Sequence, residues 1–350
     1  MSVSTTAATA GVVSGVRRRR MVRSAWLVAS VLLLVVVVFA SLTIGARPLS
    51  FDEVLGALFA PRHGDVDQVV VRELRVPRTV IGLMAGAALA LVGAILQGVT
   101  RNPIADPGLL GINAGASFAV VLAISVFGIV SPSGFVWFAF AGAALAAVIV
   151  FVVGSRGRDG STPVKLALTG AAVTAAFTPL ITIVLLSSLD TLNQFRFWSV
   201  GALVGRPLDT AGAVWPFLVV GILLAAILAR RLNLLALGDD VARGLGDRPA
   251  VTHALAAVAV VVLAGTATAL AGPIALIGLV VPHVARRITG PDYRWVLAFC
   301  LTLGPVLLLS ADVIGRVVVA PAELEAGIVS AFIGAPLLIA IIRRAKLAGV

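Results

Sequence analysis

The chain has 350 residues, of which 60% are hydrophobic and only 12% are charged, and its mean hydropathy is +1.10. Soluble domains carry about 25% charged residues, so this composition excludes a soluble protein and indicates a polytopic membrane protein. The single cysteine, Cys300, lies in an apolar run and excludes a disulfide framework or a cysteine-rich metal site. A formal net charge of +11 would suit nucleic acid, but the positions of the charges favour another explanation.

Ten apolar runs predict transmembrane helices in an all-α membrane protein, because a hydrocarbon core about 30 Å thick takes roughly 20 helical residues to cross. The first run follows a polar tail, residues 1–24, which carries Arg17–Arg20 and Arg23 and which we expect to be disordered and cytoplasmic. It exceeds the roughly 7–15 residues of a signal-peptide core, so we expect an uncleaved span. The predicted spans are 25–44, 79–98, 108–130, 133–153, 166–189, 211–229, 251–271, 273–288, 295–313 and 326–342. We expect 25–345 to form one transmembrane domain.

Two connecting segments have a predicted conformation of their own. Between the first two spans, Leu49–Phe59 has the pattern of an amphipathic helix lying on the membrane surface. After the second span, Asn102-Pro103 and Asp106-Pro107 each force the preceding residue out of the helical region. We therefore expect a sharp turn there.

The charges are distributed unequally between the two sides of the predicted topology. With the N-terminus inside, 19 of the 27 basic and six of the 16 acidic residues lie inside, a balance of +13. The other eight basic and ten acidic residues lie outside, a balance of −2. An excess of Lys and Arg marks the cytoplasmic side, so both termini are predicted to be cytoplasmic. The basic balance is thus a topology signal, and no nucleic-acid partner is expected.

Two nine-residue segments resemble each other. Ala85–Gly93 and Ala264–Gly272 are identical at six of nine positions and run in opposite directions across the membrane in this topology. An inverted repeat of spans 2–5 and 7–10, common in transporters, would explain the match. Chance similarity between Ala- and Gly-rich segments is the alternative.

Residues that would carry chemistry are missing. No Asp, Glu, Lys or Arg falls in the middle of a predicted span, so the sequence offers no proton relay. It contains no phosphate-binding G-x-x-x-x-G-K-[ST] motif, and no Cys/His cluster has metal-ligand spacing. We expect no catalytic residue, cofactor or metal, and any ATPase would be a separate chain.

The cytoplasmic segment Arg230–Pro249 is too polar to be a span. Asp239 and Asp240 follow Gly238, where negative charge suits a helix N-terminus. The segment predicts two short helices that expose a docking surface of apolar residues, namely Leu234, Leu235, Leu237, Val241 and Leu245. An ordinary cytoplasmic loop is the alternative.

Seven stretches of the chain resemble one family in its own order. The longest are GAALALVGAILQGVTRNPIADPGLLGINAGAS (86–117), AGPIALIGLVVPHVARRITGPDYR (271–294) and ADVIGRVVVAPAEL (311–324). The others are RVPRT (75–79), FRFWSVGAL (195–203), LALGDDVARGLG (235–246) and GIVSAFIGAP (327–336). They resemble the FecCD-type permease subunits of ABC importers for iron siderophores and vitamin B12. The NAGASF, FRFW and VSAFIGAP segments are most similar to ferric-enterobactin-type permeases.

The resemblance implies a multi-pass permease that moves a ferric siderophore across the inner membrane. Its implied partners are a periplasmic or extracellular siderophore-binding protein, a second permease subunit (a related chain or an identical copy) and two ATPase subunits. Vitamin B12 or haem are alternative substrates. A proton-coupled secondary transporter and a receptor-like membrane protein are alternatives of other classes.

The resemblance also implies roles for particular residues. Arg75, Arg78 and Arg316 would lie exposed on the outer side and pair with glutamates of the binding protein. A coupling loop at 232–249 would dock on the ATPase through Leu235, Leu237, Gly238, Val241, Ala242, Arg243, Leu245 and Gly246. A cytoplasmic gate would consist of Asn102, Pro103 and Ile104, with the loop Thr162–Val164 opposite.

Each of these assignments has a simpler alternative. Arg78 would then anchor a span at the interface, and Asn102-Pro103 would only end a helix. Arg316 would pair with Asp312, which lies four residues earlier on the same helical face.

Overall fold

A computed structural model describes residues 4–45, 47–60, 62, 65–129, 131–154, 156 and 163–347, and within these ranges the regular structure is entirely helical. The first half contains α1 (Ser4–Thr43), α2 (Phe51–Phe59), α3 (Val66–Val69), a π-helical turn (Val70–Arg75), α4 (Val76–Thr100), a 3₁₀ turn (Pro107–Leu110), α5 (Ile112–Ser125), α6 (Pro132–Gly154) and α7 (Pro163–Ser187). The second half contains α8 (Leu189–Ser199), α9 (Leu208–Leu235), α10 (Asp239–Gly244), α11 (Pro249–Ala271), α12 (Ile277–Thr289), α13 (Tyr293–Val318) and α14 (Ala326–Leu347).

Each of the ten predicted spans coincides with a helix, which confirms the predicted membrane fold. The ten helices are α1, α4, α5, α6, α7, α9, α11, α12, α13 and α14. Seven of the described helices are long and apolar enough to cross a membrane by themselves. The other three are shorter or have a shorter apolar part: α5 has 14 residues, α12 has 13, and α14 is apolar over Ala326–Ala340.

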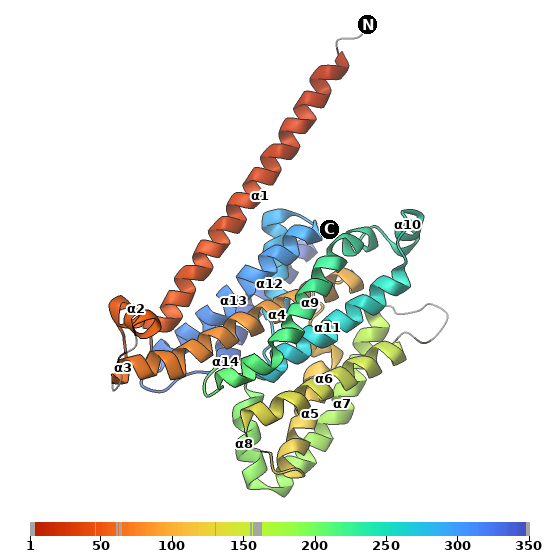
Figure 1. The fold of residues 1–350 in the computed structure, drawn as a ribbon. Coiled ribbons are helices and arrows are strands. Elements are labelled where there is room, and N and C mark those ends of the chain that lie inside the picture. The colour runs from red at the N-terminus through yellow and green to blue at the C-terminus, as the bar shows by residue number, and fades with distance from the viewer. Residues whose placement is uncertain are drawn as a thin grey trace.

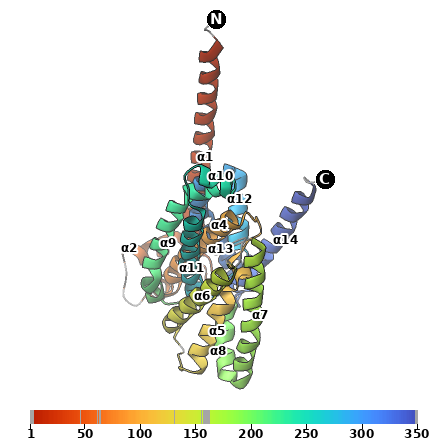
Figure 2. The ribbon, with the colours of Figure 1, turned by 90° about the vertical axis from the view of Figure 1, so that its right-hand side faces the viewer.

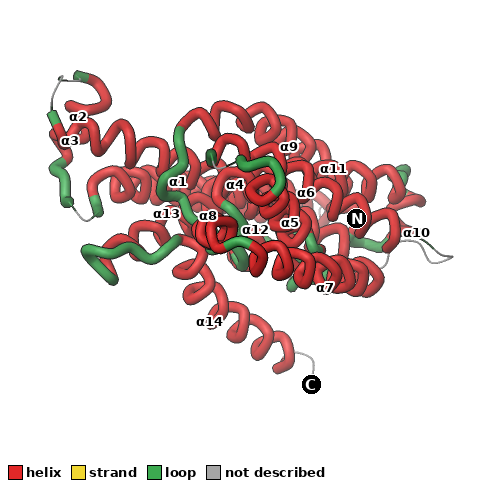
Figure 3. The backbone as a smooth tube through the Cα atoms, turned by 90° about the horizontal axis from the view of Figure 1, so that it is seen from below, coloured by secondary structure: helices red, strands yellow, loops and turns green. Residues whose placement is uncertain are grey.

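The two ends of the molecule carry different elements. The N-terminal end of α1, the C-terminal end of α14 and the short helix α10 lie towards one end, and α2, α3 and α8 lie towards the other (Figure 1; Figure 2). This arrangement agrees with the predicted sidedness, in which both termini and the segment 232–249 are cytoplasmic. Helix α14 leans away from the body, as Figure 2 and Figure 3 both show.

Helix α4 lies at the centre and packs against α13, α11, α9 and α12. Its many Ala and Gly residues allow neighbouring backbones to approach closely, as in other membrane helix pairs. A Cβ atom added to Gly93 would lie 1.7 Å from the carbonyl oxygen of Gly278, and one added to Gly86 would lie 2.7 Å from the backbone of Pro305. The composition of this span is therefore a packing requirement.

The two predicted halves share an order of elements. Each begins with a long helix (α4 or α11), breaks at a segment that contains a non-glycine residue with positive φ, and continues with a short helix and two long ones. The two strained residues are Arg101, with φ 48°, and Leu276, with φ 71°. Moreover, α4 and α11, which carry the two similar nonapeptides, pack against each other. This shared order is what an inverted repeat predicts.

Two local predictions need correction. The predicted tail is helical from Ser4, because α1 runs without a break from there into the first span. Of the two short helices predicted in Arg230–Pro249, only α10 is separate, because α9 continues through Leu235. By contrast, the surface helix predicted at Leu49–Phe59 is present as α2, and a capping box of Ser50 and Glu53 starts it.

Candidate functional site

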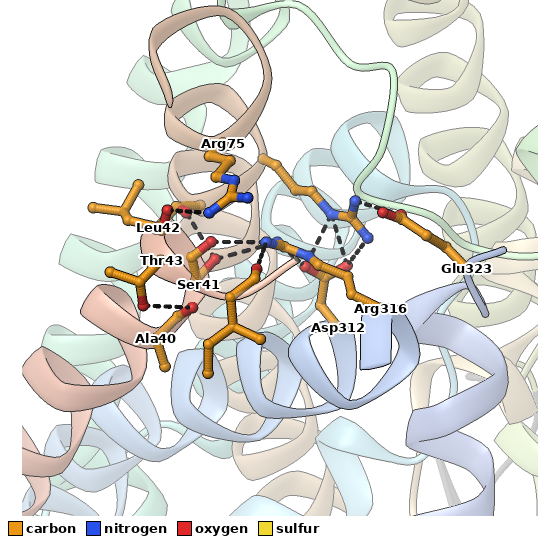
Figure 4. A network of polar contacts seen from close by, with 11 residues as sticks. Ala40, Ser41, Leu42, Thr43, Arg75, Asp312, Arg316 and Glu323 are labelled. Atoms are coloured by element: carbon orange, nitrogen blue, oxygen red, sulfur yellow. Dashed lines mark hydrogen bonds and ion pairs between the residues drawn. The ribbon is translucent and has the colours of Figure 1, made fainter. Parts of the chain in front are cut away.

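The outer ends of α4 and α13 are joined by a buried charge cluster around Asp312. The Arg78 Nε atom donates to both carboxylate oxygens of Asp312 at 2.9 Å, and its Nη2 donates to Oδ1 at 2.7 Å. From the other side, Nη2 of Arg316 donates to Oδ2 of Asp312 (Figure 4). Asp312 is fully buried, so two guanidinium groups share a carboxylate that water does not reach.

Further hydrogen bonds tie this cluster to α1 and to the loop after α13. The second terminal nitrogen of Arg78 donates to Oε2 of Glu323 at 2.6 Å. Nη1 of Arg316 donates to the carbonyl oxygens of Ser41 at 2.7 Å and Ile44 at 3.1 Å. Because these carbonyls lie at the end of α1, the cluster holds three helix ends together.

The third predicted arginine, Arg75, is also bonded within the chain. Its guanidinium donates to the carbonyl oxygen of Leu42 at 2.6 Å and to that of Arg47. The three arginines expected to meet a binding protein are thus buried, being 5% (Arg75), 8% (Arg78) and 2% (Arg316) exposed. The expectation of exposed ion pairs is wrong for this chain, and the alternative pairing of Arg316 with Asp312 is present. Contact of these arginines with a partner remains a prediction.

A pocket of about 460 Å³ lies beside the cluster at the same end of the molecule. Its lining includes five arginines and two glutamates: Arg47, Arg75, Arg78, Arg206, Arg316, Glu73 and Glu323. Arg206, in the loop between α8 and α9, was not a predicted site residue, because in the sequence it is only one of eight basic residues on the outer side.

At the opposite end, α10 presents an apolar surface. The side chains of Leu237, Val241 and Leu245 are 60%, 50% and 58% exposed, respectively. Two other predicted docking residues, Leu235 and Ala242, are fully buried. The prediction that they belong to the exposed docking surface is therefore wrong.

Polar and glycine residues of the coupling segment shape α10. Arg243 pairs with Asp240 at 2.6 Å on the surface. Gly238 and Gly246 have φ values of 109° and 86°, which side-chain-bearing residues rarely adopt, so glycine is required at both ends of the helix.

The predicted gate is a tight turn between α4 and the 3₁₀ turn. The Asn102 Oδ1 atom accepts a hydrogen bond from the backbone N–H of Ile104 at 3.1 Å, which closes the turn across Pro103. The 3₁₀ turn that follows packs against α7. In the predicted opposite loop, Thr162 lies outside the described residues, whereas Pro163 and Val164 begin α7.

Arg101 connects the turn at Asn102 and Pro103 to the predicted coupling loop, residues 232–249. Its Nε donates to the carbonyl oxygen of Leu235 at 2.9 Å, and its guanidinium pairs with Asp239 at the start of α10. Arg101 and Asp239 lie 138 positions apart in the sequence, and no sequence pattern connects them. The contact places the end of α4 and the start of α10 in direct mechanical connection.

Two more buried polar residues surround the turn. Gln97, 3% exposed, donates to the carbonyl oxygen of Gly278 at 3.1 Å and accepts from Arg286, which links α4 to α12. Gln97 could have been identified from the sequence as a polar residue inside an otherwise apolar span. Asp106 accepts from the N–H of Gly108 at 2.9 Å, its Oδ2 has no partner among the described residues, and burial raises its pKa to about 6.

The described residues contain no group of three or more His, Cys, Asp or Glu that could hold a metal ion. The arrangement comprises an exposed apolar surface at α10, a turn connected to it through Arg101 and an outer charged pocket.

Comparison with known proteins gives one consistent result. The model of the FecCD transport family matches residues 33–344. The ferric enterobactin transport system permease protein FepD of Escherichia coli (strain K12) is 48% identical over 314 residues, which are 89% of this chain and 93% of that protein. The iron(3+)-hydroxamate import system permease protein FhuB of Bacillus subtilis (strain 168) is 38% identical over 320 residues, 91% of this chain and 83% of that protein.

A solved structure has the same fold. A transporter described as a metal-chelate type ABC transporter, in an inward-facing conformation, superposes with a TM-score of 0.80 at 28% sequence identity. The match covers 92% of this chain and 99% of that chain. With the family match extending over most of the sequence, the chain belongs to the FecCD transport family.

Proposed function

We propose that this chain is the permease subunit of an ABC importer that moves a ferric siderophore inward across the cytoplasmic membrane. The permease itself is non-catalytic, and a separate ATPase chain hydrolyses ATP. Family membership and relatives named for ferric enterobactin and iron(3+)-hydroxamate support this substrate class. Vitamin B12 and haem would use the same fold, but neither is named for the relatives compared above.

The single observation that carries the mechanism is the contact of Arg101 with the coupling segment. The exposed face of Leu237, Val241 and Leu245 would enter a cleft of the ATPase. Any displacement of α10 would act on Asp239 and, through its ion pair, on Arg101 at the end of α4. The adjoining turn of Asn102 and Pro103 would move with it and open or close the cytoplasmic gate.

The assembly contains further chains at both membrane faces. A soluble binding protein delivers the chelate at the outer end, where the predicted contact residues Arg75, Arg78 and Arg316 lie beside the charged pocket. A second permease subunit completes the pore, and two ATPase subunits bind at the α10 end.

A proton-coupled carrier finds little support in the buried charges. Its carboxylate would need to exchange protons during transport, whereas Asp312 is held between Arg78 and Arg316. Both oxygens of the Asp312 carboxylate accept hydrogen bonds from these guanidinium groups.

The first test is substrate uptake. Cells with and without this gene would be given radioactive iron as several purified ferric siderophores, and labelled vitamin B12 in parallel. Loss of uptake of one ferric siderophore with B12 uptake intact is the expected result. Loss of B12 uptake alone would contradict the proposed substrate.

The second test concerns the coupling surface. Val241→Glu would place a charge in the centre of the exposed apolar face and should abolish co-purification of the ATPase, while the permease still inserts and runs as a single species on size exclusion. Val66→Glu, at an even more exposed position near the outer end, is the matched control. Equal ATPase retention in both variants would contradict the docking role of α10.

A further inference from the structure

A smaller cavity of about 220 Å³, the inner pocket, lies at the end of the molecule that holds α10. The ends of α4, α9 and α12, the start of α13 and the turn after α4 contribute residues to its lining. Its charged lining residues are Arg101 and Arg286, and no carboxylate of the described residues belongs to it. Its volume is below the roughly 300–1,000 Å³ of pockets for drug-sized molecules, so the inner pocket suits a small anionic group.

Arg286 brings a positive charge to the inner pocket that no described carboxylate neutralises. It lies in the last turn of α12, and its Nη2 atom donates to the side-chain oxygen of Gln97, which is a neutral acceptor. No ion pair joins Arg286 to an Asp or Glu within the described residues, whereas Arg78 and Arg316 share Asp312. A guanidinium has five N–H donors and stays charged in proteins, so Arg286 keeps donors for a further acceptor.

Arg101 supplies the second positive charge, and its own ion pair is exposed to water. Its Nε atom donates to the carbonyl oxygen of Leu235 at 2.9 Å, and its Nη2 atom donates to Asp239. The side chains of Arg101 and Asp239 are 44% and 37% exposed, and exposed pairs of this kind contribute little to stability. An incoming anion would therefore compete with Asp239 for Arg101.

We propose that the inner pocket binds a phosphate group between Arg101 and Arg286. The group would belong to a phosphate compound of the cytoplasm or to an anionic lipid of the cytoplasmic leaflet. A phosphate group presents several strong acceptor oxygens, so guanidinium groups from two helices can bind it at once, each through paired hydrogen bonds. The hydroxyl of Tyr293, a further lining residue, adds another donor type to the site. This site goes beyond the proposed function, in which neither the chelate nor the ATPase occupies the inner pocket.

The inner pocket is linked to α10 through Arg101. A phosphate that binds Arg101 replaces Asp239 as its partner, so the ion pair that connects the end of α4 to α10 would open. Bound phosphate would then connect the end of α4 to α12, through Arg286, in place of α10. Asp239→Asn removes the competing carboxylate and should therefore strengthen phosphate binding severalfold.

The experiment measures the unfolding temperature of the purified full-length permease in neutral detergent. Sodium phosphate is titrated against sodium chloride at equal ionic strength, and in a parallel series phosphatidylglycerol is added to the micelles against an equal amount of phosphatidylcholine. A ligand that binds only the native state raises the unfolding temperature as its concentration rises, which yields an apparent dissociation constant. Each variant is compared with its own value in chloride, so a change in basal stability does not enter the result.

The variants separate the inner pocket from its surroundings. Arg101→Gln and Arg286→Gln should each weaken phosphate binding roughly tenfold or more, because each removes charged hydrogen-bond donors. Arg286→Lys should bind more weakly than wild type and more tightly than Arg286→Gln, because lysine keeps the charge and loses the fork. Arg287→Gln is the matched control: Arg287 is the exposed neighbour of Arg286, does not line the inner pocket, and its variant should bind like wild type.

The two probes identify the source of the phosphate group. A rise in unfolding temperature with inorganic phosphate assigns the ligand to the cytoplasm, and a rise with phosphatidylglycerol alone assigns it to the cytoplasmic leaflet. No rise with either probe would overturn the proposal, and so would an equal rise in all variants, which phosphate produces through its general exclusion from protein surfaces. Loss of ATPase co-purification in Arg286→Gln, with phosphate binding unchanged, would overturn it too and would assign the inner pocket to a side chain of the ATPase. Siderophore uptake tests the proposed function separately from all these outcomes.

Discussion

Replacing Asp312 with Asn should destabilise the permease strongly. The carboxylate is fully buried, accepts three hydrogen bonds from Arg78 and is bonded by Arg316. Asn keeps the shape and one acceptor oxygen, but it presents an NH₂ group to guanidinium donors and leaves two positive charges without their shared counter-ion. Removing one partner of a buried ion pair typically costs about 3–5 kcal/mol, and we expect a loss of that order in the free energy of unfolding.

The assay is unfolding of the purified permease in mixed detergent micelles, followed by helical circular dichroism. Glu323→Gln is the matched control. It also removes a partner of Arg78, but the Glu323 side chain is 33% exposed, so the free energy of unfolding should fall by only about 0–1 kcal/mol. Adding Arg316→Met to Asp312→Asn should restore part of the loss, since one unpaired charge is then removed. Equal stability of the two single variants would refute the assignment of Asp312 as the centre of the cluster.

Three further changes test other parts of the structure. Gly93→Ala should abolish stable folding or lower the free energy of unfolding by more than about 3 kcal/mol, because the added Cβ would lie 1.7 Å from a backbone carbonyl oxygen. Gly212→Ala should be tolerated, because its Cβ would have no atom within 4 Å beyond its chain neighbours and the backbone of its own helix. Thermal unfolding of the two variants tests this difference. Burial raises the pKa of Asp106 from 3.8 to about 6, so the native chain binds the proton more tightly than the unfolded chain. The protonated carboxyl should therefore stabilise the fold fully below about pH 4, and this stabilisation should be lost as the pH rises through 6. At about 1.4 kcal/mol per pH unit the loss is about 3 kcal/mol, and Asp106→Asn should flatten unfolding midpoints between pH 4 and 8. Arg101→Gln should leave ATPase binding intact and reduce siderophore transport. Arg294→Gln, at an exposed position outside the segment 232–249, should transport normally, and equal transport by both variants would contradict the coupling link.

The membrane fold was predictable because hydropathy and chain length act locally. All ten predicted spans coincide with helices, and the placement of α10 at the end that holds both termini agrees with the charge distribution. The errors occur where a helix extends beyond its apolar residues into polar sequence. Polar residues do not end a helix when water or lipid headgroups can solvate them, so α1 begins at Ser4 and α9 continues through Leu235.

The candidate site was predictable only in part, because its contacts join distant segments. The position of Arg78 was identified, but not its burial, since Asp312 follows it by 234 residues. The exposed apolar face of α10 was predicted, yet the buried position of Leu235 depends on how α9 packs. Arg206 gave no local signal, because only the folded pocket distinguishes a withdrawn arginine from an exposed one.

The close approach of glycines limits how this permease can change shape. At the crossing of α4 with α12, the backbone at Gly93 is in direct contact with that at Gly278, and Gly86 and Gly304 form a second such contact with α13. Sliding either partner along α4 would bring a larger side chain into the space that only hydrogen atoms now fill. These three helices should therefore move as one rigid block, and the proposed gate would open by tilting of that block relative to the rest of the assembly.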